Sequence, residues 1–465
     1  MEEKSKGQQL KETLFHKSRN VYDVLDDCEI TCMNDYAEAY KKYLDASKTE
    51  REAVKTSIAI AEKEGYIAYE FGMKIVSGGK YYYNNRGKAL YLFVIGKESV
   101  ENGVYISAAH IDSPRIDLKQ HPLYEDSGMG FFKTHYYGGI KKYQWTATPL
   151  ALHGTVMRAD GTTVDISIGE DDSDPIFYIN DLLIHLAKDQ MSRTLGDAIP
   201  GESLNILVGS APYKDDKVDE KIKLNILSIL NEKYNITESD FISAELSVVP
   251  AMKARDIGFD RSLIGGYGHD DRVCAYPALT AMLATSDPQK TLITVLSDKE
   301  ETGSDGNTGM LCRIFADLLD EIAKAFGVNP NTMRANSKCL SADVNAAFDP
   351  NFADVYERRN NANLNEGVVL TKYTGSRGKS GTSDAGAEFV GVIRNMFDAA
   401  DIVWQTSELG KVDQGGGGTI AAYIANLNID TVDLGVPVLS MHAPCEVISK
   451  ADLYMTYKAF KVFNQ

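Results

Sequence analysis

The sequence predicts an α/β fold in which a β-rich unit interrupts a mixed-sheet α/β domain. Short apolar runs rich in β-branched residues alternate with helical patterns up to residue 119 and again from residue 251 onward. Between these parts, aromatic and β-branched segments alternate with Gly and Asp-Gly turns. The chain of 465 residues is also too long for one small core. We therefore expect a discontinuous domain over 1–119 and 251–465 and an inserted domain over 120–250.

The amino-terminal part should supply two helices and then two strands. Residues 34–64 carry apolar side chains at helical spacing, with Asn34 as the expected N-cap. Residues 88–96 and 103–110 are short apolar runs, and the second is typical of a strand buried on both faces. His110 would then lie at the carboxyl end of a buried strand, where open α/β sheets place their ligand sites.

The inserted unit should begin with antiparallel strands, because the turn at 159–162 is typical of a hairpin. Residues 178–190 and 214–234 are expected to be helical. After residue 250 the α/β pattern resumes, and it predicts in order a helix, a strand, a helix and a strand at 271–285, 291–298, 310–327 and 337–344.

Composition and charge exclude several classes of protein. The net charge of −17 argues against a nucleic acid partner, because a phosphate backbone would be repelled. No run approaches about 18 apolar residues, so no membrane partner is expected. The first residues lack the apolar core of a secretory signal, and the six cysteines do not resemble a disulfide framework. A cytoplasmic protein is the expectation.

Five residues of metal-binding type stand in short, turn-rich contexts, namely His110, Asp270, Glu301, Asp343 and His442. Two imidazoles and three carboxylates are what a pair of adjacent zinc ions needs if one carboxylate is shared. Four of the five end strand-like segments and the fifth precedes a helix, so a parallel sheet would bring them to one edge. Taken singly, the histidines and aspartates are more typical of structural roles, and the element with Glu301 fits a solvated loop equally well. The metal hypothesis depends on their convergence.

The neighbours of these residues suggest further roles. His110 and Asp112 are two positions apart on an extended segment, so Asp112 can accept the proton of the second ring nitrogen and orient the imidazole. The alternative is an ordinary loop histidine. Glu300 and Glu301 follow a strand, and adjacent carboxylates there suit a general base and a metal ligand, respectively. The alternative is a solvated loop pair.

Asp270 and Asp271 lie between a glycine-rich turn and a helix, where carboxylates also serve as helix caps. We assign the metal bridge to Asp270 and a structural or capping role to Asp271. The glycine run 415–418 lacks the lysine of a phosphate loop and is interpreted as a turn into a helix, with or without a bound carboxylate. Residues 372–385 form either a mobile surface loop or a pocket wall.

Five ordered segments, AAHIDSPRIDLK, GHDDRVCAY, DKEETGSDG, SADVNAAFDP and MHAPCEV, resemble the aspartyl aminopeptidase and vacuolar aminopeptidase I family of dizinc exopeptidases. The resemblance covers nearly the whole chain. It implies a three-layer zinc-exopeptidase-like catalytic domain over 1–119 and 251–465 and a β-rich dimerisation domain over 120–250. It also implies a zinc pair on the five ligands with Asp270 bridging, Glu300 as general base, and Asp112 orienting the first histidine.

The same resemblance implies a tetrahedral dodecamer built from dimers, in which His185 reaches the active site of a neighbouring subunit. Lys372 matches a lysine near the family's substrate pocket. Where aspartyl enzymes carry Asp-Asn at the bridge, this chain has Asp270-Asp271, as do related dizinc aminopeptidases of other specificity. The preferred N-terminal residue, acidic or not, stays open.

These observations predict a metallo-aminopeptidase that removes the N-terminal residue of peptides with two divalent ions. Zinc is expected, and Mn²⁺ or Co²⁺ accept the same ligands. An amidohydrolase acting on acylated amino acids is the alternative within hydrolases, since the same metal site can serve it. A non-catalytic oligomeric scaffold is the alternative from another class.

Overall fold

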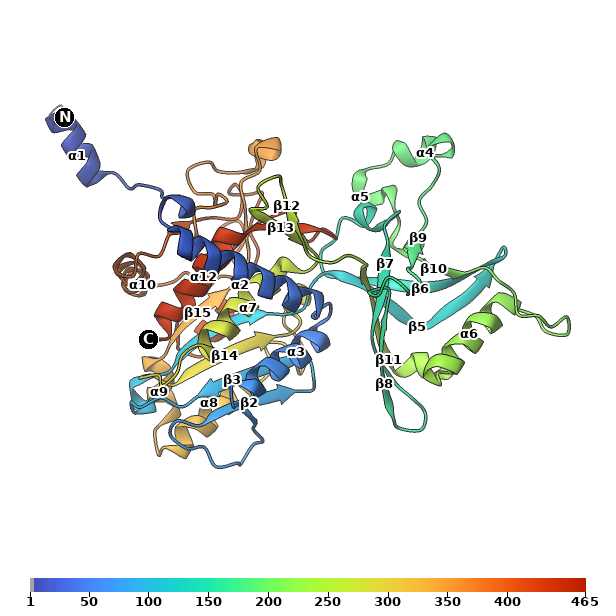
Figure 1. Cartoon of the computed structure of the whole chain (residues 1–465), viewed down its shortest axis with the longest axis horizontal. Coiled ribbons are helices and arrows are strands. Elements are labelled where there is room, and N and C mark those ends of the chain that lie inside the picture. Colours follow the sequence, from blue (N-terminus) through green and yellow to red (C-terminus); the bar gives the residue numbers. More distant parts are fainter. Residues whose placement is uncertain (1–3) are drawn as a thin grey trace.

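A computed structural model describes residues 4–465 and shows three β-sheets with helices around them (Figure 1). The largest sheet has nine strands in the order β1-β2-β3-β14-β4-β15-β19-β17-β18. Their bounds are, in that order, Ile67–Ala68, Lys80–Asn85, Ala89–Val94, Leu292–Ser297, Tyr105–His110, Lys338–Ala342, Asp430–Gly435, Val368–Thr371 and Trp404–Thr406.

The nine-stranded sheet is the middle of three layers. Along β3, Leu90 and Leu92 pack into one hydrophobic core and Tyr91 and Phe93 into another, because successive side chains of a strand point to opposite faces. The first core contains residues of α2 (Asp27–Asp45), α3 (Glu50–Lys63), α7 (His269–Leu283), α10 (Ala387–Ala399) and α12 (Lys450–Phe463). The second contains residues of α8 (Ile314–Ala325), α9 (Pro330–Asn336) and α11 (Ala421–Ala425). The predicted three-layer α/β architecture is confirmed.

The start of the first long helix differs from the prediction. Asp26 is the N-cap of α2, and its carboxylate accepts a hydrogen bond from the backbone nitrogen of Glu29. Asn34 lies inside this helix and caps nothing at its start, so that prediction is wrong. The cap was misplaced because the apolar periodicity becomes regular only after the helix has already begun. The short helix α1 (Lys6–Leu14) precedes it and projects from the body of the protein (Figure 1).

A second sheet of seven strands forms the lobe to the right of the nine-stranded sheet (Figure 1). Its order β8-β7-β11-β5-β6-β10-β9 corresponds to Thr163–Ile168, Leu150–Met157, Ala244–Pro250, Arg115–Asp126, Met129–Tyr137, Ile206–Gly209 and Tyr178–Ile179. The predicted hairpin is confirmed by the pairing of β7 with β8. Helix α6 (Lys221–Tyr234) packs against this sheet, within the segment expected to be helical.

The helix expected over 178–190 does not form. The segment instead contains strand β9, a 3₁₀ helix at Ile184–Leu186 and the short helix α4 (Lys188–Met191), followed by α5 (Leu195–Ala198). Four of its leucine and isoleucine residues, Leu182, Leu183, Ile184 and Leu186, are exposed, whereas Ile179 and Ala187 are buried, so the apolar spacing did not record one buried helical face.

A third, five-stranded sheet has the order β12-β13-β21-β20-β16, which corresponds to Arg255–Ile257, Leu263–Gly266, Glu446–Ser449, Pro437–Leu439 and Asn345–Ala346. It brings the segment after β20 beside the start of α7, because β13 precedes that helix and pairs with β21. Among residues 4–465, no helix is both long and apolar enough to cross a bilayer.

Candidate metal centre

Three of the proposed ligands follow three neighbouring parallel strands. His110 is the last residue of β4, Asp343 comes directly after β15, and Glu301 lies in the 3₁₀ helix Glu300–Thr302 that follows β14. Strand β4 pairs in parallel with both β14 and β15. The carboxyl ends of the three strands therefore meet at one edge of the sheet, as parallel α/β sheets require.

The other two proposed ligands come from the third sheet and its surroundings. Asp270 stands in non-helical conformation at the start of α7, and His442 has a left-handed backbone in the turn after β20. Both are held by Glu446, whose carboxylate accepts hydrogen bonds from the backbone nitrogens of Asp270 at 3.0 Å and His442 at 2.7 Å. The sequence interpretation missed Glu446. Its position in MHAPCEV, four residues after His442, was the available signal.

The five side chains form two groups that share Asp270. His110 Nε2 lies 3.1 Å from Asp270 Oδ1 and 3.8 Å from Asp343 Oδ1. On the other side, His442 Nε2 lies 3.1 Å from Asp270 Oδ2 and 3.4 Å from Glu301 Oε1. Within each group the ligand atoms lie within 4.8 Å of one another. Each group thus offers one imidazole nitrogen and two carboxylate oxygens to a cation.

The donor set fits divalent metal ions. Asp270 Oδ1 and Glu301 Oε1 are buried, and their contacts with the imidazole nitrogens lack hydrogen-bond geometry, so within residues 4–465 neither oxygen has a hydrogen-bond partner. Burial lowers the pKa of His442, but the hydrogen bond to Asp270 and the charges of Glu301 and Asp270 raise this pKa to about 10. Without a metal, protons must compensate the buried carboxylates. Zinc accepts these nitrogen and oxygen donors in their place.

Glu300 stands beside the two groups. Its Oε2 lies 3.9 Å from His110 Nε2. Burial, followed by the charge of Asp343, raises the pKa of Glu300 to about 8. Asp112 fixes the turn that carries Glu300. Its Oδ1 accepts a hydrogen bond from the backbone nitrogen of Glu300 at 3.1 Å, and its Oδ2 accepts one from the backbone nitrogen of Glu301 at 3.2 Å.

Asp112 also contacts the first histidine. His110 Nδ1 lies 3.0 Å from the carbonyl oxygen of Asp112 and 3.3 Å from its Oδ1. These acceptors favour a proton on Nδ1, which leaves the lone pair of Nε2 directed toward Asp270 and Asp343. Asp112 is completely buried.

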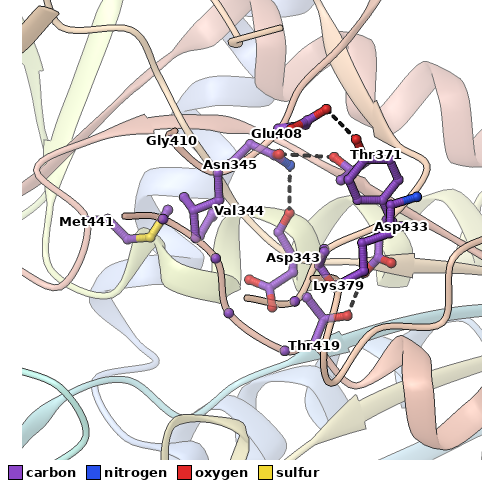
Figure 2. Close-up of a pocket in the computed structure, with 18 of the residues that line it drawn as sticks. Asp343, Val344, Asn345, Thr371, Lys379, Glu408, Gly410, Thr419, Asp433 and Met441 are labelled. Carbon is purple, nitrogen blue, oxygen red and sulfur yellow. Dashed lines mark hydrogen bonds between the residues drawn. The ribbon is translucent and has the colours of Figure 1, made fainter. Parts of the chain in front are cut away.

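A cavity of about 370 Å³ opens from the two groups and extends along the loop 373–379 and the glycine run 415–418. The loop expected to be either mobile surface or pocket wall is therefore a wall. Figure 2 shows Asp343 at this cavity, with Asn345 bridging it to Thr371 by hydrogen bonds of 3.4 and 3.0 Å.

Close backbone packing requires the first two glycines of the run, Gly415 and Gly416. A Cβ on Gly415 would lie 1.7 Å from the carbonyl oxygen of Leu409, and one on Gly416 would lie 2.1 Å from that of Gly375. No larger residue fits at either position without moving the cavity wall.

The remaining expected residues lie elsewhere. His185 is exposed in the 3₁₀ helix of the second lobe, and it does not line the cavity of its own chain within the described part. Lys372 pairs with Asp384 at 2.6 Å and faces a second cavity near Trp404. Asp271 is completely buried, and neither of its carboxylate oxygens has a hydrogen-bond partner among residues 4–465, so it does not cap α7 through its side chain.

Comparisons with known proteins agree with this geometry. Residues 43–464 match the model of the family described as aminopeptidase I zinc metalloprotease (M18). A probable M18 family aminopeptidase 1 of Clostridium acetobutylicum is 49% identical over 458 residues, which cover 97% of this chain and 98% of the relative. The crystal structure of an M18 family aminopeptidase from Thermotoga maritima is 42% identical, with a TM-score of 0.93 over 97% of this chain and 100% of that one.

The fold extends to more distant proteins. The structure of the S. cerevisiae mApe1 dodecamer is 21% identical, with a TM-score of 0.76 over 92% of this chain and 96% of that one. The family match spans most of the chain, and the relatives at 42 and 49% identity cover nearly all of it. The chain therefore belongs to the M18 family of zinc aminopeptidases, which are hydrolases.

Proposed function

We propose that the chain removes the N-terminal residue of peptides at a site for two zinc ions. One ion would be held by His110, Asp270 and Asp343, and the other by Asp270, Glu301 and His442. One observation carries this proposal: the two oxygens of Asp270 lie 3.1 Å from the Nε2 atoms of two different histidines. A carboxylate placed in this way can serve two cations at once.

The chain's own residues supply the proton transfers. Bound divalent ions would contribute Lewis acidity, which polarises the scissile carbonyl and makes a water molecule more acidic. Glu300 would accept the proton of the attacking water and donate it to the leaving amine. Burial and the charge of Asp343 raise the pKa of Glu300, whereas bound cations would lower it again, so that Glu300 can accept the proton and release it near neutral pH. Asp112 would hold His110 and the turn that carries Glu300 in fixed positions relative to each other.

The shape and charge of the cavity support cleavage at chain ends. Carboxylates of Glu301 and Asp343 at its inner end favour a cationic α-amino group. Farther out, Arg377 and Lys411 favour an acidic N-terminal side chain, whereas the apolar Val412 favours a neutral one. Both substrate classes therefore belong in the test.

The second lobe supports assembly into a homo-oligomer. Its segment 176–195 exposes a row of apolar side chains, namely Ile176, Tyr178, Leu182, Leu183, Ile184, Leu186, Met191 and Leu195. Exposed apolar surface of this extent is typical of a protein contact. We propose that residues 120–250 form the dimer contact of a tetrahedral dodecamer, as the dodecameric state of mApe1 suggests. His185, inside this segment, would then enter the site of the neighbouring subunit.

A cytoplasmic location is part of the proposal. All six cysteines are free thiols, and two of them, Cys28 and Cys32, are exposed. A reducing compartment keeps exposed thiols in this state.

A panel of substrates tests the activity. The protein is stripped of metal, reloaded with zinc, Mn²⁺ or Co²⁺, and assayed on acidic, neutral and basic aminoacyl anilides and on N-acetylated amino acids. We expect cleavage of the anilides alone, and only after reloading. Hydrolysis of the N-acetylated compounds instead would assign an amidohydrolase, and no turnover with any metal would favour the scaffold.

A further inference from the structure

The end of β6 crosses from the second lobe to the candidate metal centre. Tyr137 is the last residue of this strand, and its hydroxyl donates a hydrogen bond of 2.8 Å to Asp112 Oδ2. Two residues later, the carbonyl oxygen of Gly139 lies 2.8 Å from Nδ1 of His442. Three consecutive residues thus reach both histidine groups from a sheet that contributes no metal ligand to the proposed site.

We propose that residues 137–139 position the two halves of the metal centre from the second lobe, with Tyr137 acting as a positioning residue through Asp112. The inference rests on the proposed metal site. It concerns how tightly the chain holds its ions and assigns no step of the reaction to Tyr137.

Asp112 depends on the Tyr137 hydroxyl. The buried carboxylate of Asp112 contacts His110 Nδ1 and the backbone nitrogens of Glu300 and Glu301. These contacts hold the first histidine and the 300–301 turn in place. Oδ2 receives only the Tyr137 hydroxyl and the Glu301 nitrogen as hydrogen-bond donors among residues 4–465. Removal of the hydroxyl leaves this oxygen short of one donor, so the carboxylate can turn and release His110 and the 300–301 turn together.

The Tyr137 ring is itself held by Arg115 of the second sheet, which is in turn held by helix α3 of the three-layer domain. The guanidinium of Arg115 lies over the ring, 4.1 Å from its centroid, and the two residues face each other across β5 and β6. Arg115 in turn pairs with Glu50 of α3 at 2.9 Å and with Asp117 of β5 at 2.8 Å. The hydroxyl is therefore aimed by groups of both lobes.

Gly139 and Gly138 fix the second half of the site. The Gly139 carbonyl accepts a hydrogen bond from Nδ1 of His442. This bond directs the Nε2 atom of His442 toward Asp270 and Glu301. Gly138 has a φ of 72°, and a Cβ there would lie 3.4 Å from Glu301 Oε2. The strand end thus lies directly against two ligands of one half, Glu301 and His442, and reaches His110 of the other half through Asp112.

The test measures zinc affinity. Metal-free Tyr137→Phe protein is titrated with zinc against a chromophoric chelator, next to wild type and Tyr136→Phe. Tyr136 is the matched control because it is the neighbouring, exposed tyrosine on the other face of the strand. We expect affinity about tenfold weaker in Tyr137→Phe, the lower end of the loss for an outer partner of a metal ligand, because Tyr137 acts on His110 only through Asp112, and unchanged affinity in Tyr136→Phe.

Two further readouts separate positioning from general destabilisation. With saturating zinc, Tyr137→Phe should lower kcat and leave KM for the preferred anilide unchanged, because Tyr137 does not line the substrate cavity among the described residues. Metal-free Tyr137→Phe should unfold only a few degrees below the wild type, as the loss of one donor to a buried acceptor implies, and zinc should raise its unfolding temperature less than it raises that of the wild type. Wild-type zinc affinity in Tyr137→Phe, or equal losses in both tyrosine variants, would overturn the proposal. Failure of the wild type to bind two ions would instead overturn the proposed function.

Discussion

The buried carboxylate of Glu446 accepts a hydrogen bond from the backbone nitrogen of Asp270, 176 residues earlier in the chain. Its other oxygen accepts from the backbone nitrogen of His442. One side chain therefore sets the distance between the proposed bridging carboxylate and the histidine of one half of the site.

We expect Glu446→Gln to bind zinc about 10- to 100-fold more weakly, because glutamine keeps one acceptor and turns its NH₂ toward the other backbone N–H. Chelator competition measures the affinity. Glu388→Gln, which neutralises an exposed carboxylate, is the control and should bind zinc as the wild type does. Unchanged zinc affinity in Glu446→Gln would show that the backbone holds Asp270 and His442 without it.

Glu300→Gln should retain zinc and lose catalysis. A positioned general base contributes about 10²- to 10⁴-fold to the rate, and the amide cannot accept the proton. Steady-state kcat and zinc content are measured on the same sample. Glu301→Gln is the paired variant, and it should lose zinc from the half of the site with His442. Full turnover by Glu300→Gln would remove Glu300 from the mechanism.

Gly416→Ala should impair substrate binding. The added Cβ would lie 2.1 Å from the carbonyl oxygen of Gly375, and the φ of 114° is unfavourable for alanine. The two loops that form the cavity wall must then separate, and we expect KM to rise about tenfold, which corresponds to about 1.4 kcal/mol of lost binding. Gly378→Ala, where an added Cβ meets nothing within 4 Å, should leave KM unchanged. Equal KM values in the two variants would contradict the close packing.

The elements that carry the candidate ligands were predictable because buried parallel strands have a strong local signal. The apolar runs that end at His110 and precede Glu301 and Asp343 are strands β4, β14 and β15, and their shared direction brings the three side chains together. His442 follows β20 of the smaller sheet instead. Its approach to Asp270 depends on Glu446, a contact between distant segments that no local pattern encodes.

The failures of prediction have the same origin. Tyr137 and Gly139 reach Asp112 and His442 across 25 and 303 residues of sequence, so neither had a local context that indicated a role at the site. The segment 178–190 was misjudged because most of its large apolar side chains are exposed in this chain. Apolar spacing indicates a helix only where it corresponds to one buried face of that helix.

A mixing experiment tests whether His185 acts between subunits. His185→Ala protein keeps its metal ligands, and Glu300→Gln protein keeps His185, so each alone should be nearly inactive. Dissociation and reassembly of a mixture should restore activity, because an intact metal site would meet a His185 from its neighbour. Leu186→Glu, which places a charge in the exposed apolar row, should yield smaller assemblies by sedimentation. No recovery in the mixture, with assembly intact, would exclude the exchange.

His153 joins the second sheet to helix α3 through a charge that depends on pH. Its Nδ1 lies 2.8 Å from Glu52 Oε1, and its Nε2 lies 3.2 Å from Glu170 Oε1. Burial lowers the pKa of His153, but the hydrogen bonds to Glu170 and Glu52 outweigh burial and raise the pKa to about 8. A histidine in the unfolded chain titrates near about 6.5. The resulting stabilisation is therefore complete below about pH 6.5 and is lost as the pH rises through about 8.

We expect the difference in free energy of unfolding between wild type and His153→Gln to fall by about 2 kcal/mol from about pH 6 to about pH 9, because folding raises the pKa of His153 to about 8. Urea unfolding at closely spaced pH values measures it. His121→Gln supplies the control, because it removes an imidazole that is exposed at the surface, whereas His153 is buried between Glu52 and Glu170. A flat difference for His153→Gln would mean that the folded protein holds this imidazole neutral, with no ion pair between the lobes to lose.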